Sequence, residues 1–242
     1  MARLARIIWR LDFDFSWSYV DSMGSMLRAV VETVPKFWDE AHDGQLIRTY
    51  GARRKAEDLV CDITIAPQSF YGTVAWPLGT ELGVSLNTES FAGLDRIVHE
   101  LLALSEVNVL RRAGIRFGGV EKRHSRFSVK GTPFGNYVPD NVLAVVTKDY
   151  GEVNDVAFIL QGKTKDGISY RTQAGPYAEA NVRQHIPDIT AEQLRAFEGH
   201  EMFFDIDLWE NDISFREHSL FRWGTTKVES AMTFIKLLQN LG

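Results

Sequence analysis

The chain has 242 residues, of which 45% are hydrophobic and 24% are charged, and its formal net charge is −5. This composition is typical of a globular protein that buries a sizeable core without disulfide or metal staples. No stretch of eighteen apolar residues occurs, so we expect no membrane partner, and the acidic balance argues against generic binding to nucleic acid.

The cysteine content indicates a reducing compartment. Cys61 is the single cysteine, which excludes an internal disulfide, and it lies in an apolar run typical of a buried, inert thiol. Near the start of the sequence, the apolar residues 7–9 are followed by Arg10 and Asp12, so the run is too short for a secretory signal. We therefore expect a cytoplasmic protein.

The first two predicted elements are a strand and a helix. Residues 5–14 alternate between apolar and charged side chains, and a period of two indicates a half-buried strand. Between residues 20 and 34 the apolar side chains recur every three or four positions, which predicts a helix with one apolar stripe. Pro35 is expected to end this helix.

A hairpin, a second helix and another strand follow. Residues 58–65 and 69–76 are rich in β-branched and aromatic side chains and flank a turn at Pro67. Apolar side chains at helical spacing between 91 and 101 predict the helix, and the alternating residues 107–117 predict the strand. The resulting order, β-α-β-β-α-β, is that of a ferredoxin-like unit with an antiparallel sheet.

The second half of the sequence echoes this order. Asp166 and Gly167 mark a tight turn between two short strands, and residues 202–210 alternate as a further strand. Capping boxes that begin at Thr190 and Thr226 predict two helices.

These elements predict an α+β fold made of two ferredoxin-like halves, with a mainly antiparallel sheet and helices mostly on one face. The first half is residues 1–120, and the second half is residues 141–242. A basic connector with glycines and prolines, residues 121–140, joins them into one compact unit.

Two strands carry the pattern Asp-x-Asp and are the only concentrated candidates for chemistry. Residues i and i+2 of a strand share a face, so we expect Asp12 and Asp14 to project together, as do Asp205 and Asp207. Paired carboxylates on such a sheet hold Mg²⁺ or Mn²⁺ in polymerase-type domains. This hypothesis predicts a metal-dependent enzyme that processes nucleotides or nucleic acids. Its better candidates are Asp205 and Asp207, because their own strand has no basic residue.

The alternative for the same strands is a ladder of arginine–aspartate ion pairs. Arg10 shares a face with Asp12 and Asp14. Arg112 and Arg116 share a face on the strand that the ferredoxin-like order places beside the first strand. Ion pairs between these neighbours neutralise the carboxylates and prevent metal binding, in which case no cofactor is expected.

A basic segment, residues 111–130, and an acidic segment, residues 201–217, divide the charge of the chain. Either the two segments pair with each other, or each meets its own partner. Aromatic residues lie among the basic ones, which suits a nucleic-acid backbone. The candidates for anion or nucleic-acid binding are Arg112, Arg116, Lys122, Arg123 and Arg126.

Sequence motifs of enzymes are missing. The chain has no metal-ligand spacing of histidines, no dinucleotide or Walker glycine pattern and no Gly-x-Ser-x-Gly elbow. Its 6 tryptophans and 15 phenylalanines are a heavy aromatic load, and some aromatics, such as Trp209, lie beside charged residues, as they do at protein interfaces. The leading hypothesis is therefore a non-enzymatic binding or assembly protein that acts as a homodimer or as an accessory subunit with a protein partner. The metal-dependent enzyme and the nucleic-acid binder remain alternatives.

Three blocks of the sequence, RLDFDF, LRRAGIRFGGVEK and FFDIDLW, resemble landmarks of a sporadically distributed prokaryotic family of similar length and without an assigned activity. Its members similarly carry a mid-chain Arg-Gly-Arg strand and a late aspartate strand. The chain departs from the family at residues 117–119, Phe-Gly-Gly, where an aromatic residue followed by Asn is expected. The resemblance implies an accessory role and carries over no catalytic residue.

Overall fold

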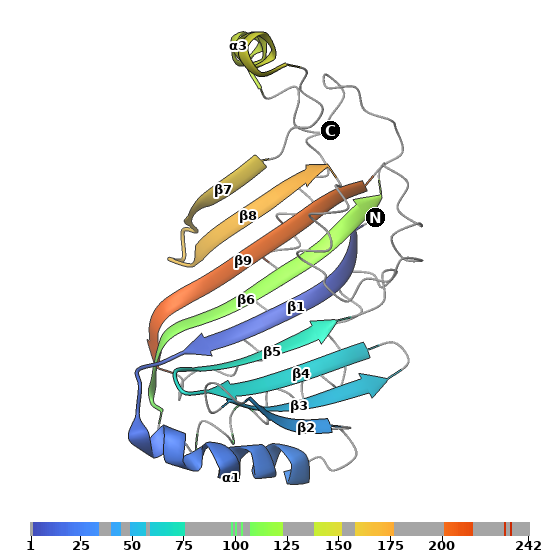
Figure 1. Cartoon of the computed structure of the whole chain (residues 1–242). Helices are drawn as coiled ribbons and strands as arrows, with labels where there is room; N and C mark the ends of the chain where they lie inside the picture. The colour runs from blue at the N-terminus through green and yellow to red at the C-terminus, as the bar shows by residue number, and fades with distance from the viewer. Residues whose placement is uncertain are drawn as a thin grey trace.

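The structure is a computed structural model that describes residues 2–33, 40–44, 49–56, 59–75, 98, 100, 103, 107–122, 138–151, 158–176, 201–214, 230 and 233 (Figure 1). In chain order, the elements with described bounds are β1 (Ala2–Asp12), α1 (Trp17–Thr33), β2 (Glu40–Gly44), β3 (Thr49–Ala56), β4 (Leu59–Ala66), β5 (Ser69–Ala75), β6 (Val109–Lys122), α3 (Asp140–Tyr150), β7 (Phe158–Lys163), β8 (Ser169–Pro176) and β9 (Glu201–Ser214).

The strands form a nine-stranded antiparallel sheet in the order β2-β3-β4-β5-β1-β6-β9-β8-β7. Figure 1 shows this sheet as one twisted layer, with α1 near β2 and β3 and with α3 beyond β7. The combination of helices with an antiparallel sheet confirms the α+β class. At the middle of the sheet, β1, β6 and β9 join the start, the centre and the later part of the chain.

The alternation of side chains gives the sheet an apolar face and a polar face. On β1, Ile7, Trp9 and Leu11 are fully buried, whereas Arg10 is exposed. Trp9 packs edge-to-face against Phe70, with the ring centroids 5.0 Å apart. Neighbouring strands add further buried side chains to the apolar face: Ile63, Ile65, Ile115, Phe117, Phe204 and Ile206.

The helix expected after the first strand is confirmed as α1. Ser16 caps it: the Ser16 hydroxyl accepts a hydrogen bond from the N–H of Tyr19 at 3.4 Å, and its carbonyl accepts one from Val20 at 3.1 Å. The buried side chains of Tyr19, Met23 and Met26 form the apolar stripe. This helix contacts β3 and β4, so it covers part of the sheet.

The structure adds two strands that the sequence pattern does not predict, β2 and β3. Residues 49–56 of β3 include Arg53, Arg54 and Lys55 and show no apolar alternation. Pairing with β4 supplies the backbone hydrogen bonds of β3, which outweighs its weak strand propensity. The predicted hairpin of residues 58–65 and 69–76 is therefore the second half of a four-stranded meander.

The hairpin around Gly167 is confirmed as β7 and β8. Gly167 has a φ of 85°, which glycine adopts without strain, and its N–H donates to the carbonyl of Thr164 at 3.0 Å. The apolar run from Val142 to Val146 belongs to a helix, α3. Its acidic Asp140 lies in the first turn and its basic Lys148 in the last, where each charge complements the helix dipole.

The other predicted helices fall mostly outside the described residues. For the one expected at 91–101, Val98 and Glu100 are helical, and Val98 is fully buried. The helix expected from Thr190 lies outside them entirely, and the last one is represented by Ser230 and Thr233. No helix in the described part of the chain is long and apolar enough to cross a membrane.

Candidate functional site

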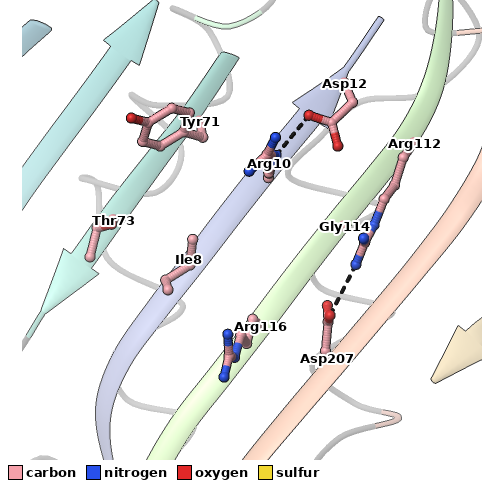
Figure 2. A pocket seen from close by; sticks show the side chains of 9 residues that line it. All are labelled: Ile8, Arg10, Asp12, Tyr71, Thr73, Arg112, Gly114, Arg116 and Asp207. Atoms are coloured by element: carbon pink, nitrogen blue, oxygen red, sulfur yellow. Dashed lines mark hydrogen bonds and ion pairs between the residues drawn. The ribbon is translucent and has the colours of Figure 1, made fainter. Parts of the chain in front are cut away.

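Alternate residues of four adjacent strands line a groove on the polar face of the sheet. As predicted, β6 lies beside β1, with Arg10 opposite Gly114 and Asp12 opposite Arg112. β5 flanks β1 on one side and β9 flanks β6 on the other. The groove has a volume of about 640 Å³ and is lined by Ile8, Arg10, Asp12, Tyr71, Thr73, Arg112, Gly114, Arg116 and Asp207 (Figure 2).

Two arginines of β6 form ion pairs with the two aspartates of β9. Arg112 donates from Nη2 to Oδ2 of Asp207 at 3.0 Å. Arg116 donates from Nε to Oδ1 of Asp205 at 2.7 Å and from Nη2 to Oδ2 of the same carboxylate. The side chain of Asp205 is only 9% exposed, so this two-point ion pair holds a carboxylate at the edge of the core.

The arginine–aspartate pairs run diagonally between the strands. Arg116 stands opposite Asp207 in the strand register, yet it bonds Asp205, which stands opposite Gly118. A Cβ at Gly118 would meet nothing within 4 Å, so the space above this position on the polar face is open.

Arg112 also bonds diagonally, but over a longer offset: it stands opposite Asn211 in the register and bonds Asp207, four residues away along β9. Its guanidinium carbon lies 4.7 Å from the ring centroid of Trp209, which stands opposite Gly114, and it reaches Asp207 beyond. A Cβ at Gly114 would lie 3.4 Å from Cβ of Trp209 and 3.6 Å from Nε of Arg112. The spacing Arg-x-x-x-Arg in β6 places both arginines on the polar face, because residues at even spacing along a strand share a face.

The first Asp-x-Asp pair is divided between two partners. Arg10 donates from Nε to Oδ1 of Asp12 at 2.7 Å, within β1. Because β1 ends at Asp12, Asp14 lies beyond the strand and pairs with Nε of Arg111 at 2.6 Å. The arginine–aspartate ladder is therefore present, but Arg112 and Arg116 bond the aspartates of β9 instead of those of β1.

Burial raises the pKa of Asp207 above its ordinary value of 3.8. The charges of Arg112 and Arg116 lower it, the charge of Asp205 raises it, and the net direction is upward. For Arg116, the hydrogen bond to Asp205 raises the pKa, so this guanidinium stays charged.

The raised pKa of Asp207 predicts a pH-dependent contribution to stability. The folded protein takes up this proton at a higher pH than the unfolded chain, so the stabilisation is complete below the unfolded value of 3.8 and is lost as pH rises through the folded pKa. We expect the unfolding free energy of the wild type, relative to Asp207→Asn, to increase as pH falls from neutrality. Urea titrations across this range measure the difference, and a constant difference would contradict the assignment.

The structure brings the basic and acidic segments together. β6 pairs with β9 along almost its whole length, and Arg112 and Arg116 bond aspartates of that acidic strand. Lys122 is the last residue of β6. Arg123 and Arg126 and the rest of the predicted connector up to residue 137 lie outside the described residues.

All four aspartates considered as cation ligands bond arginines. Asp205 and Asp207 have no basic residue on their own strand, but the neighbouring strand β6 supplies Arg116 and Arg112. Among the described residues, no three His, Cys, Asp or Glu side chains lie close enough together to hold a metal ion.

Tyr71 and Thr73 are groove residues that sequence reasoning missed. Both lie on β5, where Tyr71 stands opposite Arg10 and Thr73 opposite Ile8. The alternation of β5 assigns them to one face, but only the pairing of β5 with β1 shows that this face carries the arginines.

Comparison with models of known protein families and with curated proteins yields no match to this chain. The resemblance to the sporadically distributed prokaryotic family therefore stays a prediction, and the candidate site is defined by its own geometry.

Proposed function

We propose that the protein is a non-enzymatic binding or assembly protein of the cytoplasm, and that the groove on the polar face holds a carboxylate-bearing segment of a partner protein. The observation that carries this proposal is how the charged side chains of the groove are paired. Its aspartates are neutralised by arginines, while two of these arginines retain accessible donors.

The accessible arginines are Arg10 and Arg112, whose side chains are 58% and 40% exposed. A guanidinium has five N–H donors. The ion pair of Arg10 with Asp12 uses Nε, and the ion pair of Arg112 with Asp207 uses one terminal nitrogen. Among the described residues, the remaining donors of these two side chains are free to bind a further carboxylate.

The other lining residues favour a protein segment over a phosphate backbone. Three arginines share the groove with Asp12 and Asp207, so the local excess of positive charge is small. Nucleic-acid binding depends on net neutralisation of many phosphates, which such a groove does not supply. Tyr71 and Thr73 add hydroxyl groups and Ile8 adds apolar surface, a mixture that suits a peptide with both polar and apolar side chains.

We also propose that the first 120 residues are built around a ferredoxin-like unit. The adjacent antiparallel strands β4, β5, β1 and β6, together with a helix directly after β1, support this proposal. The added strands β2 and β3 then extend its edge.

A photo-crosslinking amino acid at Tyr71 tests the groove in cells that produce the protein. We expect it to capture a defined partner, and we expect capture to disappear when Arg112→Gln is added. The matched control places the same crosslinker at Trp17, an aromatic residue of α1 that is 72% exposed. Equal capture from both positions, insensitive to Arg112→Gln, would show that the groove is not the binding surface.

A further inference from the structure

Among the described strands, the two at the edges of the sheet differ in their protection against pairing with another strand. β2 forms one edge, and its five residues include Glu40, His42 and Asp43. β7 forms the other edge and has the sequence FILQGK, in which Lys163 at the end is the only charged residue. Charges, prolines and bulges are the usual devices that block an edge. The six residues of β7 contain no proline, and their register with β8 has no bulge.

The β7 edge is apolar on both faces of the sheet. Ile159 is 54% exposed and Leu160 is 39% exposed. Because adjacent residues of a strand point to opposite faces, Ile159 lies at the rim of the polar face and Leu160 at the rim of the apolar face. An added strand at this edge would cover both side chains.

The outward backbone groups of β7 are placed by the hairpin. The N–H of Thr164 donates to the carbonyl of Ile168 at 2.8 Å, which fixes the pattern of hydrogen bonds at the turn. In an antiparallel pair, successive residues alternate between bonding the partner and facing away. Counting back from Thr164, the N–H and C=O groups of Ile159 and Gln161 face away from β8.

We infer that a second copy of this chain pairs with the β7 edge, antiparallel, with Leu160 opposite the same residue of the other copy. In this register Ile159 stands opposite Gln161 of the other copy. The outward N–H and C=O groups of these two residues then bond each other, and the two-fold axis repeats the same pair of bonds on its other side. The two copies of Lys163 lie at opposite ends of the pair, so like charges do not meet.

The unequal edges explain why this assembly closes at two copies. A contact between β7 of one copy and β2 of the next would be head-to-tail and would propagate as a fibre. A sequence with Glu, His and Asp, such as that of β2, disfavours edge-to-edge pairing, whereas the sequence of β7 against itself is self-complementary. The second copy is therefore the occupant that fits this edge.

Helix α3 extends the interface. A six-residue strand is only about 20 Å long, so strand pairing alone buries less than the ~800 Å² per partner of a standard interface. In α3, Val142 and Val145 are 46% and 57% exposed, and no residue of the helix is buried. Seven residues separate α3 from β7, which keeps the helix within about 30 Å of the strand, beyond the edge where Figure 1 places it.

Cysteine crosslinking tests the register. The native Cys61 lies in β4, with five strands between it and β7 in the sheet order, and Cys61→Ser provides a background without cysteine. On this background we expect Leu160→Cys to form a disulfide-linked species of twice the chain mass of 27.4 kDa, because residues directly opposite lie within disulfide range. In the matched variant Ile159→Cys, the position is more exposed than Leu160. In the proposed register it lies two residues away from the same position of the other copy, so we expect little disulfide formation.

Sedimentation velocity of the full chain tests the dimer itself. We expect wild type and Gln161→Ala to sediment as dimers, whereas Gln161→Pro sediments as a monomer, since proline removes an outward N–H without removing a bond to β8. Circular dichroism of Gln161→Pro checks that the fold is retained. A monomeric wild type, a dimer that persists in folded Gln161→Pro, or equal linkage of both cysteine variants would overturn the proposal.

Discussion

Gly72→Ala is expected to destabilise the fold more than any other single methyl addition at a described glycine. Gly72 is buried in β5, and a Cβ at this position would overlap the indole ring of Trp9, which is fully buried beside it in β1. The ring has little room to move, because it also packs edge-to-face on Phe70 at 5.0 Å. Inserting a methyl group into a filled core costs about 1–3 kcal/mol, and the overlap here places the change at the upper end, about 3 kcal/mol.

Urea unfolding measures this loss, and Gly118→Ala is the matched control. Gly118 also lies within a strand, but a Cβ there would meet nothing within 4 Å. We expect the control to change the unfolding free energy by less than about 1 kcal/mol. If the indole ring is the obstacle, Gly72→Ala combined with Trp9→Leu should cost less than the sum of the two single changes. Equal effects of the two alanine substitutions would contradict the packing argument.

Arg116→Ala is expected to cost about 2–3 kcal/mol of unfolding free energy. The change removes both hydrogen bonds to Asp205 and leaves a carboxylate that is 9% exposed without its guanidinium. Breaking a fully buried ion pair costs about 3–5 kcal/mol, and the smaller figure applies because the Arg116 side chain is 36% exposed.

The exposed ion pair of Arg111 with Asp14 supplies the control. The two side chains are 66% and 73% exposed, so Arg111→Ala should change the unfolding free energy far less than Arg116→Ala does. A double variant, Arg116→Leu with Asp205→Leu, tests the origin of the loss, because it removes the Asp205 carboxylate together with its guanidinium partner. If this double variant is no more stable than Arg116→Ala, the loss of the guanidinium from the Asp205 carboxylate is not the cause.

Sequence reasoning predicts the strands of the site better than their partners. The alternation in residues 5–14 and 107–117 identifies β1 and β6, and the predicted order makes them neighbours, as observed. The same order predicts that Arg112 and Arg116 form ion pairs with Asp12 and Asp14. In the structure these arginines bond Asp207 and Asp205 of β9. The sequence does not predict this choice, because β6 lies between two strands that both carry aspartates.

Other features that the sequence pattern does not predict have local causes. The charged strand β3 lacks the alternation that marks a strand, and pairing with β4 decides its conformation. The sequence pattern assigns no element type to the run from Val142 to Val146, because an apolar run without a clear period is compatible with either a strand or a helix. Tyr71 and Thr73 carry no motif and join the groove only through the register of β5 with β1.

The central position of β1, β6 and β9 has a consequence for how the chain folds. Residue pairs such as Ile8 with Arg116 and Arg116 with Asp207 are separated by about a hundred positions in the sequence, and they form the middle of the sheet. Contacts of such long range slow folding, because the loop between the strands must close before the pairing is rewarded. During synthesis, strands β1 to β6 leave the ribosome well before β9. The ion pairs of Arg112 and Arg116 with the aspartates of β9 therefore form only after most of the chain has been made.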